Sequence, residues 1–236
     1  MGDVDKSVDV DRSDNQVSQD RVEDQVRDKV SASLGAPISK KGAQVLKGAL
    51  QVFLERGYVG ASMDRIAAVA GVSKATVYSH FRDKEGLFEA LVQQLARERL
   101  PKLFNAVSQG AARVDAPPRE CLRQLCTALM ERMTQDELYF DFLRLTIGES
   151  GRFPQLAQVF LKNFTRVGIA AFTEILSTYP ALKGRDVEAI TRVMTGSLIA
   201  HVLTQYVMHG RQVVPIEEER IIDAIVDLVL PPDPAS

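Results

Sequence analysis

The sequence predicts an all-α fold, and three observations lead to that prediction. From Ser39 onward, apolar residues recur with the i, i+3, i+4, i+7 spacing that places them on one face of a helix. Serines precede and glycines follow several of these segments, as expected for helix caps. No segment shows a convincing alternation of apolar and polar residues, so we expect no β-sheet. With 236 residues, 45% of them hydrophobic, the chain is long enough to bury a full core.

The composition excludes several classes of protein. No run of about 18 apolar residues occurs, so we expect no membrane contact, and the first 30 residues lack a signal-peptide pattern. Cys121 and Cys126 lie five positions apart in a helical pattern, which prevents a disulfide within that helix. No Cys/His cluster that would bind zinc is present. We therefore expect no metal, no cofactor and a cytoplasmic location.

Charge divides the chain into three parts. Residues 1–36 carry a net charge of −4, residues 37–86 carry +4, and residues 87–236 carry −2. The first part has no aromatic residue and a single leucine, so we expect an acidic, mostly disordered tail. Within it, Val22, Val26 and Val30 recur every four residues and would suit a helix if something packed against it. We interpret the second part as a small basic domain and the third as a larger helical domain.

The basic domain contains three predicted helices. The first begins at Ser39 and stops at Gly57. Two short helices follow, over residues 63–70 and 73–80, and each has a serine at its start as a candidate N-cap.

The two short helices have the features of a helix-turn-helix motif. Such a motif needs a small residue where the helices cross and a turn residue that tolerates positive φ. Ala67 supplies the first and Gly71 the second. The second short helix exposes hydrogen-bond donors suited to base edges and phosphates, with no acidic residue among them. The alternative interpretation is an ordinary helical hairpin with a solvated basic face.

The surrounding sequence resembles the tetracycline-repressor (TetR) family of bacterial transcription regulators. The resemblance rests on Ala49-x3-Phe53-x3-Gly57-Tyr58, followed by SMDRIAAVAGVSKATVYSHFRDKEGL over residues 62–87. Two positions depart from the commonest family pattern, Ser62 where threonine is frequent and Ala75 where glycine is frequent. Both changes are mild, because serine caps as well as threonine and alanine favours a helix.

The resemblance implies a sequence-specific regulator that binds double-stranded operator DNA. In such proteins the recognition helix enters the major groove, and flanking residues contact phosphates. Lys74 is long enough to reach a guanine edge, whereas Lys84 is expected to add affinity without sequence preference. The DNA-binding residues implied in this way are Ser62, Ser73, Lys74, Ala75, Thr76, Tyr78, His80 and Lys84.

The larger domain is predicted to be a series of helices. A long helix begins at Asp83, and we expect Pro101 to kink or break it near Arg97. Further helices are expected from Pro117 to Met133, up to Gly148 and Gly151, and from Pro154 onward, with the last two over residues 186–209 and 215–230.

The last two predicted helices indicate a homodimer. They are apolar around most of their circumference, so each needs burial on two sides. A two-fold dimer satisfies this requirement, and it matches both the resemblance and a palindromic operator. A buried helix in the core of a monomer is the alternative. The predicted interface residues are Ile190, Met194, Ser197, Leu198, His201, Ile222, Ile225 and Val229.

Between the basic domain and these helices lies a region rich in phenylalanine and tyrosine. The family has a small-molecule pocket here, and ligand pockets are apolar with a few polar anchors. The candidate ligand residues are Phe104, Phe142, Arg144, Asn163, Phe164 and Arg166, with Glu149 and His201 as further anchors. For each aromatic residue alone, a plain core position is the alternative. The stretch RLTIGESGRFPQLA, residues 144–157, also resembles the AefR-like C-terminal subgroup.

The resulting hypothesis is a repressor that a small hydrophobic ligand releases from its operator. The long helix after Asp83 would link the ligand region to the DNA-binding domain. A helical enzyme is a rival, but the three histidines belong to no recognisable catalytic constellation. A dimeric module without DNA binding is a second rival, which the intact surface from Lys74 to Lys84 disfavours. Activation instead of repression is left open, because the same contacts serve both.

Overall fold

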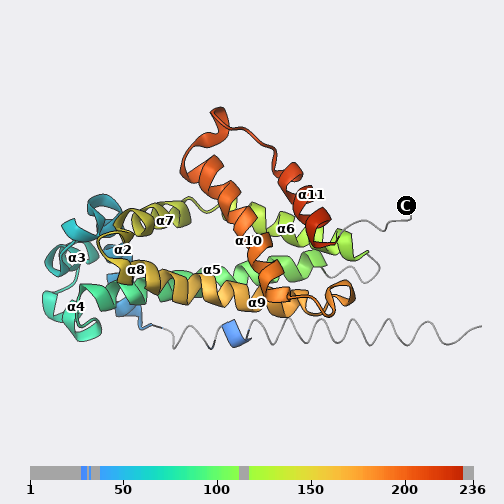
Figure 1. Ribbon diagram of the computed structural model, residues 1–236. Coiled ribbons are helices and arrows are strands. Elements are labelled where there is room, and N and C mark those ends of the chain that lie inside the picture. The colour runs from blue at the N-terminus through green and yellow to red at the C-terminus, as the bar shows by residue number, and fades with distance from the viewer. Residues whose placement is uncertain (1–27, 31, 33–37, 112–116, 231–236) are drawn as a thin grey trace, which may run out of the picture. The chain divides into compact units, whose positions relative to one another are not determined.

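The computed structural model describes residues 28–30, 32, 38–111 and 117–230, with the side chains of 103–111 left out. Every regular element in these ranges is helical, which confirms the predicted fold class (Figure 1). The chain forms two compact units. Of the described residues, unit 1 contains 28–30, 101–111, 117–134 and 169–230, and unit 2 contains 32, 38–100 and 135–168. No helix in the described part is long and apolar enough to cross a membrane.

Unit 2 contains the predicted basic domain together with later helices. Its elements are α2 (Lys40–Gly60), α3 (Met63–Ala70), α4 (Lys74–His80), the first part of α5 (Lys84–Ala111), α7 (Glu137–Ser150), α8 (Pro154–Phe160) and a π-helical turn, η1 (Leu161–Thr165). In Figure 1, α3 and α4 lie next to α2, and α7 also packs on α2. The compact unit that holds the helix-turn-helix therefore extends well beyond residue 86.

The helix ends in this unit follow the predicted caps. Ser62 Oγ accepts from the Arg65 N–H, and Ser73 Oγ accepts from the Thr76 N–H. Gly71 ends α3 with φ +64°, a left-handed conformation that glycine adopts without steric cost. Gly57 interrupts α2 at φ +68°, as predicted, although helical residues continue to Gly60. The sequence therefore encodes the two short helices locally.

Close packing between α2 and α3 fixes the motif. A Cβ at Gly48 would lie 2.8–2.9 Å from atoms of Ala70, so only glycine permits this approach. Gln44 Nε2 donates to the Ala70 carbonyl at 2.7 Å and so satisfies the C-terminal end of α3. Phe53, Ile66 and Val77 are completely buried and form the shared core of the three helices.

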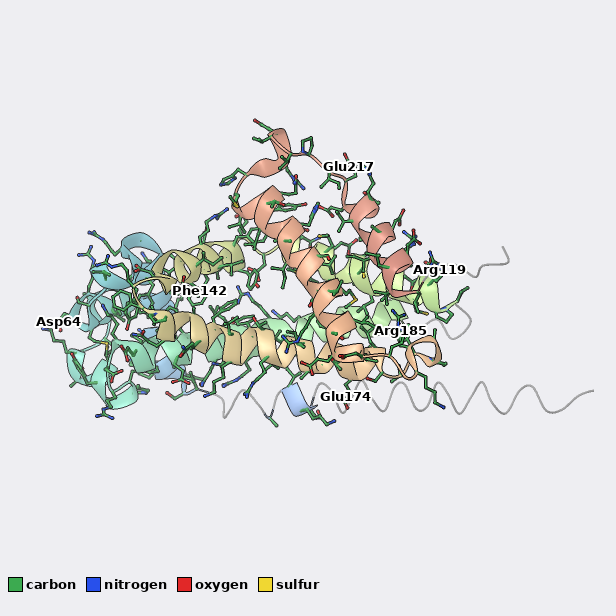
Figure 2. All side chains as sticks on the ribbon, in the orientation of Figure 1. Asp64, Arg119, Phe142, Glu174, Arg185 and Glu217 are labelled. Atoms are coloured by element: carbon green, nitrogen blue, oxygen red, sulfur yellow. The ribbon has the colours of Figure 1, made fainter. Side chains whose placement is uncertain are left out.

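Unit 1 is built around α6 (Pro118–Thr134), α10 (Val187–Val202) and α11 (Glu218–Val229), with α6 packed on both other helices. A π-helical turn, η3 (Leu203–Val207), extends α10, and two short 3₁₀ turns are η2 (Pro180–Leu182) and η4 (Gly210–Gln212). Arg119 of α6 contacts Asp227 and the Leu230 carbonyl, while Arg185 donates to the Val229 carbonyl (Figure 2). Both arginines thus hold the end of α11.

Two sequence predictions about helix ends were wrong, and a third was wrong in part. Of the kink or break expected at Pro101, the break is absent, because α5 continues from Lys84 to Ala111 with Pro101 inside it. Gly148 lies within α7, which ends at Ser150. The last helix begins at Glu218 and not at Pro215; the Val214 carbonyl, which a helix starting at Pro215 would use, accepts from Gln205 instead. One of the boundaries between the two units falls within α5, between Leu100 and Pro101.

Part of the N-terminal segment is ordered. Residues 28–30 are helical, Val30 is only 3% exposed, and Lys29 forms an ion pair with Glu174 of α9 (Arg166–Leu176) at 2.6 Å. These few helical residues lie in the segment that was expected to be mostly disordered and to form a helix only against a packing partner, and Glu174 supplies one contact. The rest of the predicted tail, apart from Ala32, lies outside the described residues.

Candidate nucleic-acid interface

The second helix of the motif, α4, presents a mostly polar surface. Only Val77 is buried, while Lys74 and Ala75 are exposed and Tyr78 is 53% exposed. Ser73 and Thr76 share a hydrogen bond of 2.8 Å between their hydroxyl groups, so both hydroxyls are held at the start of the helix. The helix α4 therefore packs against the protein on one side. Its other side is exposed and accessible to a partner as large as DNA.

Lys74 is paired within the protein. Its Nζ lies 2.5 Å from Asp64 Oδ2 of α3, and both side chains are more than half exposed (Figure 2 labels Asp64). Exposed ion pairs of this kind contribute about 0.2–1 kcal/mol, so a phosphate or a guanine edge can compete for the ammonium. Sequence reasoning missed Asp64, although its position in the first turn of α3 is typical of an acidic residue that favours a helix N-terminus.

His80 connects α4 to the beginning of α2. Its Nδ1 lies 3.0 Å from the Thr76 carbonyl, which can only accept, and its Nε2 lies 3.1 Å from Ser39 Oγ. Ser39 in turn caps α2 by accepting from the Gly42 N–H. Both ring nitrogens of His80 therefore have partners inside unit 2.

Lys84 has a structural role that its sequence position does not reveal. Its Nζ donates to the carbonyls of Tyr58 at 2.7 Å and Ala61 at 3.0 Å, and it lies 4.4 Å from the centre of the Tyr58 ring. Burial lowers the pKa of Lys84, an effect that Glu149 opposes. Two of the three ammonium donors of Lys84 are therefore used within the protein.

Tyr58 is surrounded by side chains from α2, α5, α7 and the turn before α8. Glu149 Oε1 accepts from its N–H at 3.0 Å, and the Phe153 ring lies 5.1 Å from its ring. Burial, with smaller contributions from Glu85 and Asp83, raises the pKa of Tyr58 to about 12. Glu149 had been a candidate ligand anchor, and the structure gives it a backbone partner.

The predicted ligand residues separate into two groups. Phe142 and Phe164 belong to a cluster of rings with Tyr139 and Phe160, in which Phe160 and Phe164 stack at 5.0 Å. Asn163, 95% buried in the π-helical turn, donates to the Val159 carbonyl beside this cluster. In contrast, Arg144 pairs with Asp141, and Arg166 is exposed. The side chain of Phe104 lies outside the described residues.

Most predicted dimer residues are buried within the chain. Met194, Leu198 and His201 on α10 and Ile222, Ile225 and Val229 on α11 are each at most 5% exposed. Ile190 and Ser197 are half-buried. Burial also lowers the pKa of His201, whose Nδ1 has no hydrogen-bond partner among the described residues. The surface available to another molecule on these helices lies on other residues, among them Val193 and Leu228.

The structure contains no group of three or more metal-binding side chains within its described residues. The functional positions that sequence reasoning missed are Gln44, Gly48, Asp64 and the backbone of Tyr58. Two of them left a signal in the sequence, Asp64 as an acidic residue in the first turn of a helix and Gly48 as a glycine inside an otherwise apolar helical face.

Comparison with known proteins identifies two matching regions. The family described as bacterial regulatory proteins, tetR family, matches residues 45–91, and the AefR-like transcriptional repressor, C-terminal domain, matches residues 120–231.

Among curated relatives, the HTH-type transcriptional repressor BepR of Brucella suis is 37% identical over 94 residues. The HTH-type transcriptional activator FasR of Mycolicibacterium smegmatis is 36% identical over 100 residues. These matches cover 39% and 42% of the chain, and 43% of the length of each relative.

Solved structures match over most of the chain. The flavonoid-responsive regulator FrrA is 27% identical with a TM-score of 0.65, covering 81% of this chain and 95% of that one. A TetR family transcriptional regulator from Pseudomonas syringae pv. tomato is also 27% identical, with a TM-score of 0.57 and coverage of 82% and 97%. The chain therefore belongs to the TetR family of bacterial regulatory proteins and has a C-terminal domain of the AefR-like type.

Proposed function

We propose that the protein is a sequence-specific regulator of transcription that binds double-stranded operator DNA through α4. The observation that carries this proposal is the exposed face of a capped recognition helix in a basic domain, with Lys74 at its first turn. The proposed DNA-binding set also contains Ser62, Ser73, Ala75, Thr76, Tyr78, His80 and Lys84. Donors of these types suit base edges and phosphates.

We propose that the active form is a homodimer. The apolar residues Val193, 57% exposed, and Leu228, 71% exposed, leave a surface on α10 and α11 that a second copy can cover. On α10, Gly196 and Ala200 are also exposed and lie one turn apart, which permits a close helix-to-helix approach. Two recognition helices related by a two-fold axis require a palindromic operator.

We further propose that a small hydrophobic ligand controls binding and that the default action is repression. The ring cluster of Tyr139, Phe142, Phe160 and Phe164, with Asn163 beside it, has the apolar character of a ligand site. FrrA is described as flavonoid-responsive and BepR as a repressor, and both are similar to this chain. FasR is described as an activator, so the sign of control needs a direct test. Binding of DNA also fits a cytoplasmic location, with no cofactor required.

The decisive test is footprinting on the DNA upstream of the protein's own gene. We expect protection of two half-sites about one helical turn apart, roughly 10 base pairs, and a dimer in sedimentation at micromolar concentration. A reporter fused to that promoter should rise when the gene is deleted if the protein represses. Absence of a footprint at low salt would refute DNA binding, and a monomer would refute the dimer.

Two lysine substitutions distinguish a contact with DNA bases from a contact that does not depend on sequence. Lys74→Ala should weaken binding to the footprinted site by about 1–3 kcal/mol and binding to scrambled DNA much less. Lys84→Ala should weaken binding to both DNAs similarly and lower the salt dependence. Because Lys84 also holds two carbonyls, its loss should lower the free energy of unfolding by about 1–3 kcal/mol, measured by urea denaturation. Equal effects of the two substitutions on both DNAs would contradict the assignment.

A further inference from the structure

The stretch of residues 144–157 that resembles the AefR-like subgroup lies against the helix-turn-helix region in unit 2. It comprises the end of α7, the turn at Gly151–Phe153 and the start of α8. Three of its side chains reach the helices that flank the motif: Glu149 and Phe153 contact Tyr58 of α2, and Gln155 Nε2 donates to Glu85 of α5 at 3.2 Å. The proposed function above gives this stretch no role.

The point of contact is the break in α2. At Gly57 the backbone leaves the helical conformation, with φ +68° and ψ 176°, and the following N–H is that of Tyr58. Glu149 accepts from this N–H at 3.0 Å, which is a charge-assisted bond to a carboxylate. A Cβ at residue 57 would lie 3.0 Å from the same carboxylate oxygen, so a substitution here would strain the backbone at its positive φ and press on the Glu149 side chain.

Tyr58 is held on its other sides too. Lys84 donates to its carbonyl at 2.7 Å, so both polar groups of one peptide residue are bound by side chains of opposite charge. Its ring packs against Phe153 and Phe88, at 5.1 and 5.8 Å between centroids. The orientation of α2 where it ends, and hence of the chain leading into α3, is therefore fixed from outside the motif.

The same face of α7 connects this point to the ring cluster. Phe142 and Glu149 are seven residues apart, which is two helical turns, so they lie on one face of the helix. Phe142 stacks on Phe88 at 5.3 Å and lies 6.4 Å from Phe160 (Figure 2 labels Phe142). A shift or rotation of α7 that displaces Phe142 will displace the Glu149 carboxylate with it.

We propose that Glu149, supported by Phe153, is a positioning residue that holds the helix-turn-helix in its DNA-binding arrangement and that releases it when α7 moves. This inference rests on the proposed function, because it assigns a regulatory role for the same DNA site. The Glu149 carboxylate accepts from the Tyr58 N–H, so it is proposed to act through Tyr58 and not as a DNA contact. Its loss should therefore affect binding to two correctly spaced half-sites more than binding to one.

The test uses the full chain with two duplexes, the footprinted site and a single half-site. Glu149→Ala is expected to weaken binding to the full site about tenfold and to the half-site less than twofold. Glu149→Gln, whose amide oxygen can still accept from the Tyr58 N–H, should restore binding to within about threefold of the wild type. Glu137→Gln is the matched control, because it removes a carboxylate from the exposed first turn of the same helix and should change neither.

A measurement without DNA checks the contact itself. Amide hydrogen exchange at Tyr58 should rise several-fold in Glu149→Ala, and to a smaller extent in Phe153→Leu, while Glu137→Gln matches the wild type. Unchanged exchange at Tyr58 in Glu149→Ala overturns the inference, as does an equal loss of binding to the full site and the half-site. If the wild type binds no upstream DNA, the proposed function fails and the regulatory role fails with it, whereas the exchange result still reports the contact.

Discussion

The recognition helix α4 and the paired helices α10 and α11 make an instructive comparison. In α4, the residues predicted to face outward are exposed except Thr76, which is half-buried, and only Val77 is buried. On α10 and α11, six of the eight residues predicted to meet a second subunit are buried by the chain itself. The accessible apolar residues, such as Val193 and Leu228, are neighbours of the predicted ones.

The difference arises from how much of the circumference of each helix is apolar. The short helix α4 has one aliphatic residue larger than alanine, Val77, so its inward side is determined by the sequence alone. In α10, apolar residues occur all around the axis, and burial in the chain's own core and burial against a partner produce the same pattern. The sequence of such a helix predicts that two of its faces are buried. It does not show which face packs in the chain's own core and which packs against a partner.

The largest effect is expected from adjacent substitutions on α10. Met194→Ala removes a completely buried side chain and should lower the free energy of unfolding by about 2–5 kcal/mol. Val193→Glu places a charge on the exposed face and should instead produce monomers in sedimentation, with unchanged helix content by circular dichroism. If Val193→Glu remains a dimer at micromolar concentration, the comparison holds but the dimer surface must lie elsewhere.

An intermediate effect is expected from one substitution made at two glycines of unit 2. Gly48→Ala forces a Cβ to within 2.9 Å of the Ala70 backbone and should destabilise the fold by about 1–3 kcal/mol. Gly148→Ala on α7, where nothing lies within 4 Å, should stabilise it by up to about 1 kcal/mol through helix propensity. Urea denaturation measures both, and changes of the same sign would contradict the close approach of α2 and α3.

The smallest effect is expected at the partner of Lys74. Asp64→Asn removes an exposed ion pair worth about 0.2–1 kcal/mol, so DNA binding should strengthen no more than about fivefold, for specific and scrambled sequences alike. Asp141→Asn, which removes the same charge from α7, serves as the control in gel-shift titrations. Weaker binding in Asp64→Asn would show that Asp64 supports the position of Lys74 and does not compete for it.

Local features were predictable because their causes are local. The caps at Ser62 and Ser73 and the left-handed turn at Gly71 depend on residues within four positions of one another, and the structure has them where the sequence indicates. The contacts of Lys84 and Glu149 were not predictable in this way. Their partners lie 23–26 and 91 residues away, and both bind backbone groups, which leave no side-chain signature.

The helix through Pro101 shows a second limit of local reasoning. A proline predicts the loss of one hydrogen bond, but the free energy of the remaining turns of α5 decides whether the helix breaks. The residue type at one position indicates a local cost in free energy. Whether the helix continues depends on the free energy summed over all of its turns.

In α4, the residues that stabilise the helix differ from those that face outward, and this has a consequence for protein engineering. Stability of this helix depends on the Ser73 cap, the buried Val77 and the bonds of His80, none of which needs the outward side chains of Lys74, Ala75 or Tyr78. Libraries randomised at these three outward positions should retain the fold and alter the preferred operator. The protein therefore offers a scaffold from which regulators with new DNA specificities can be selected.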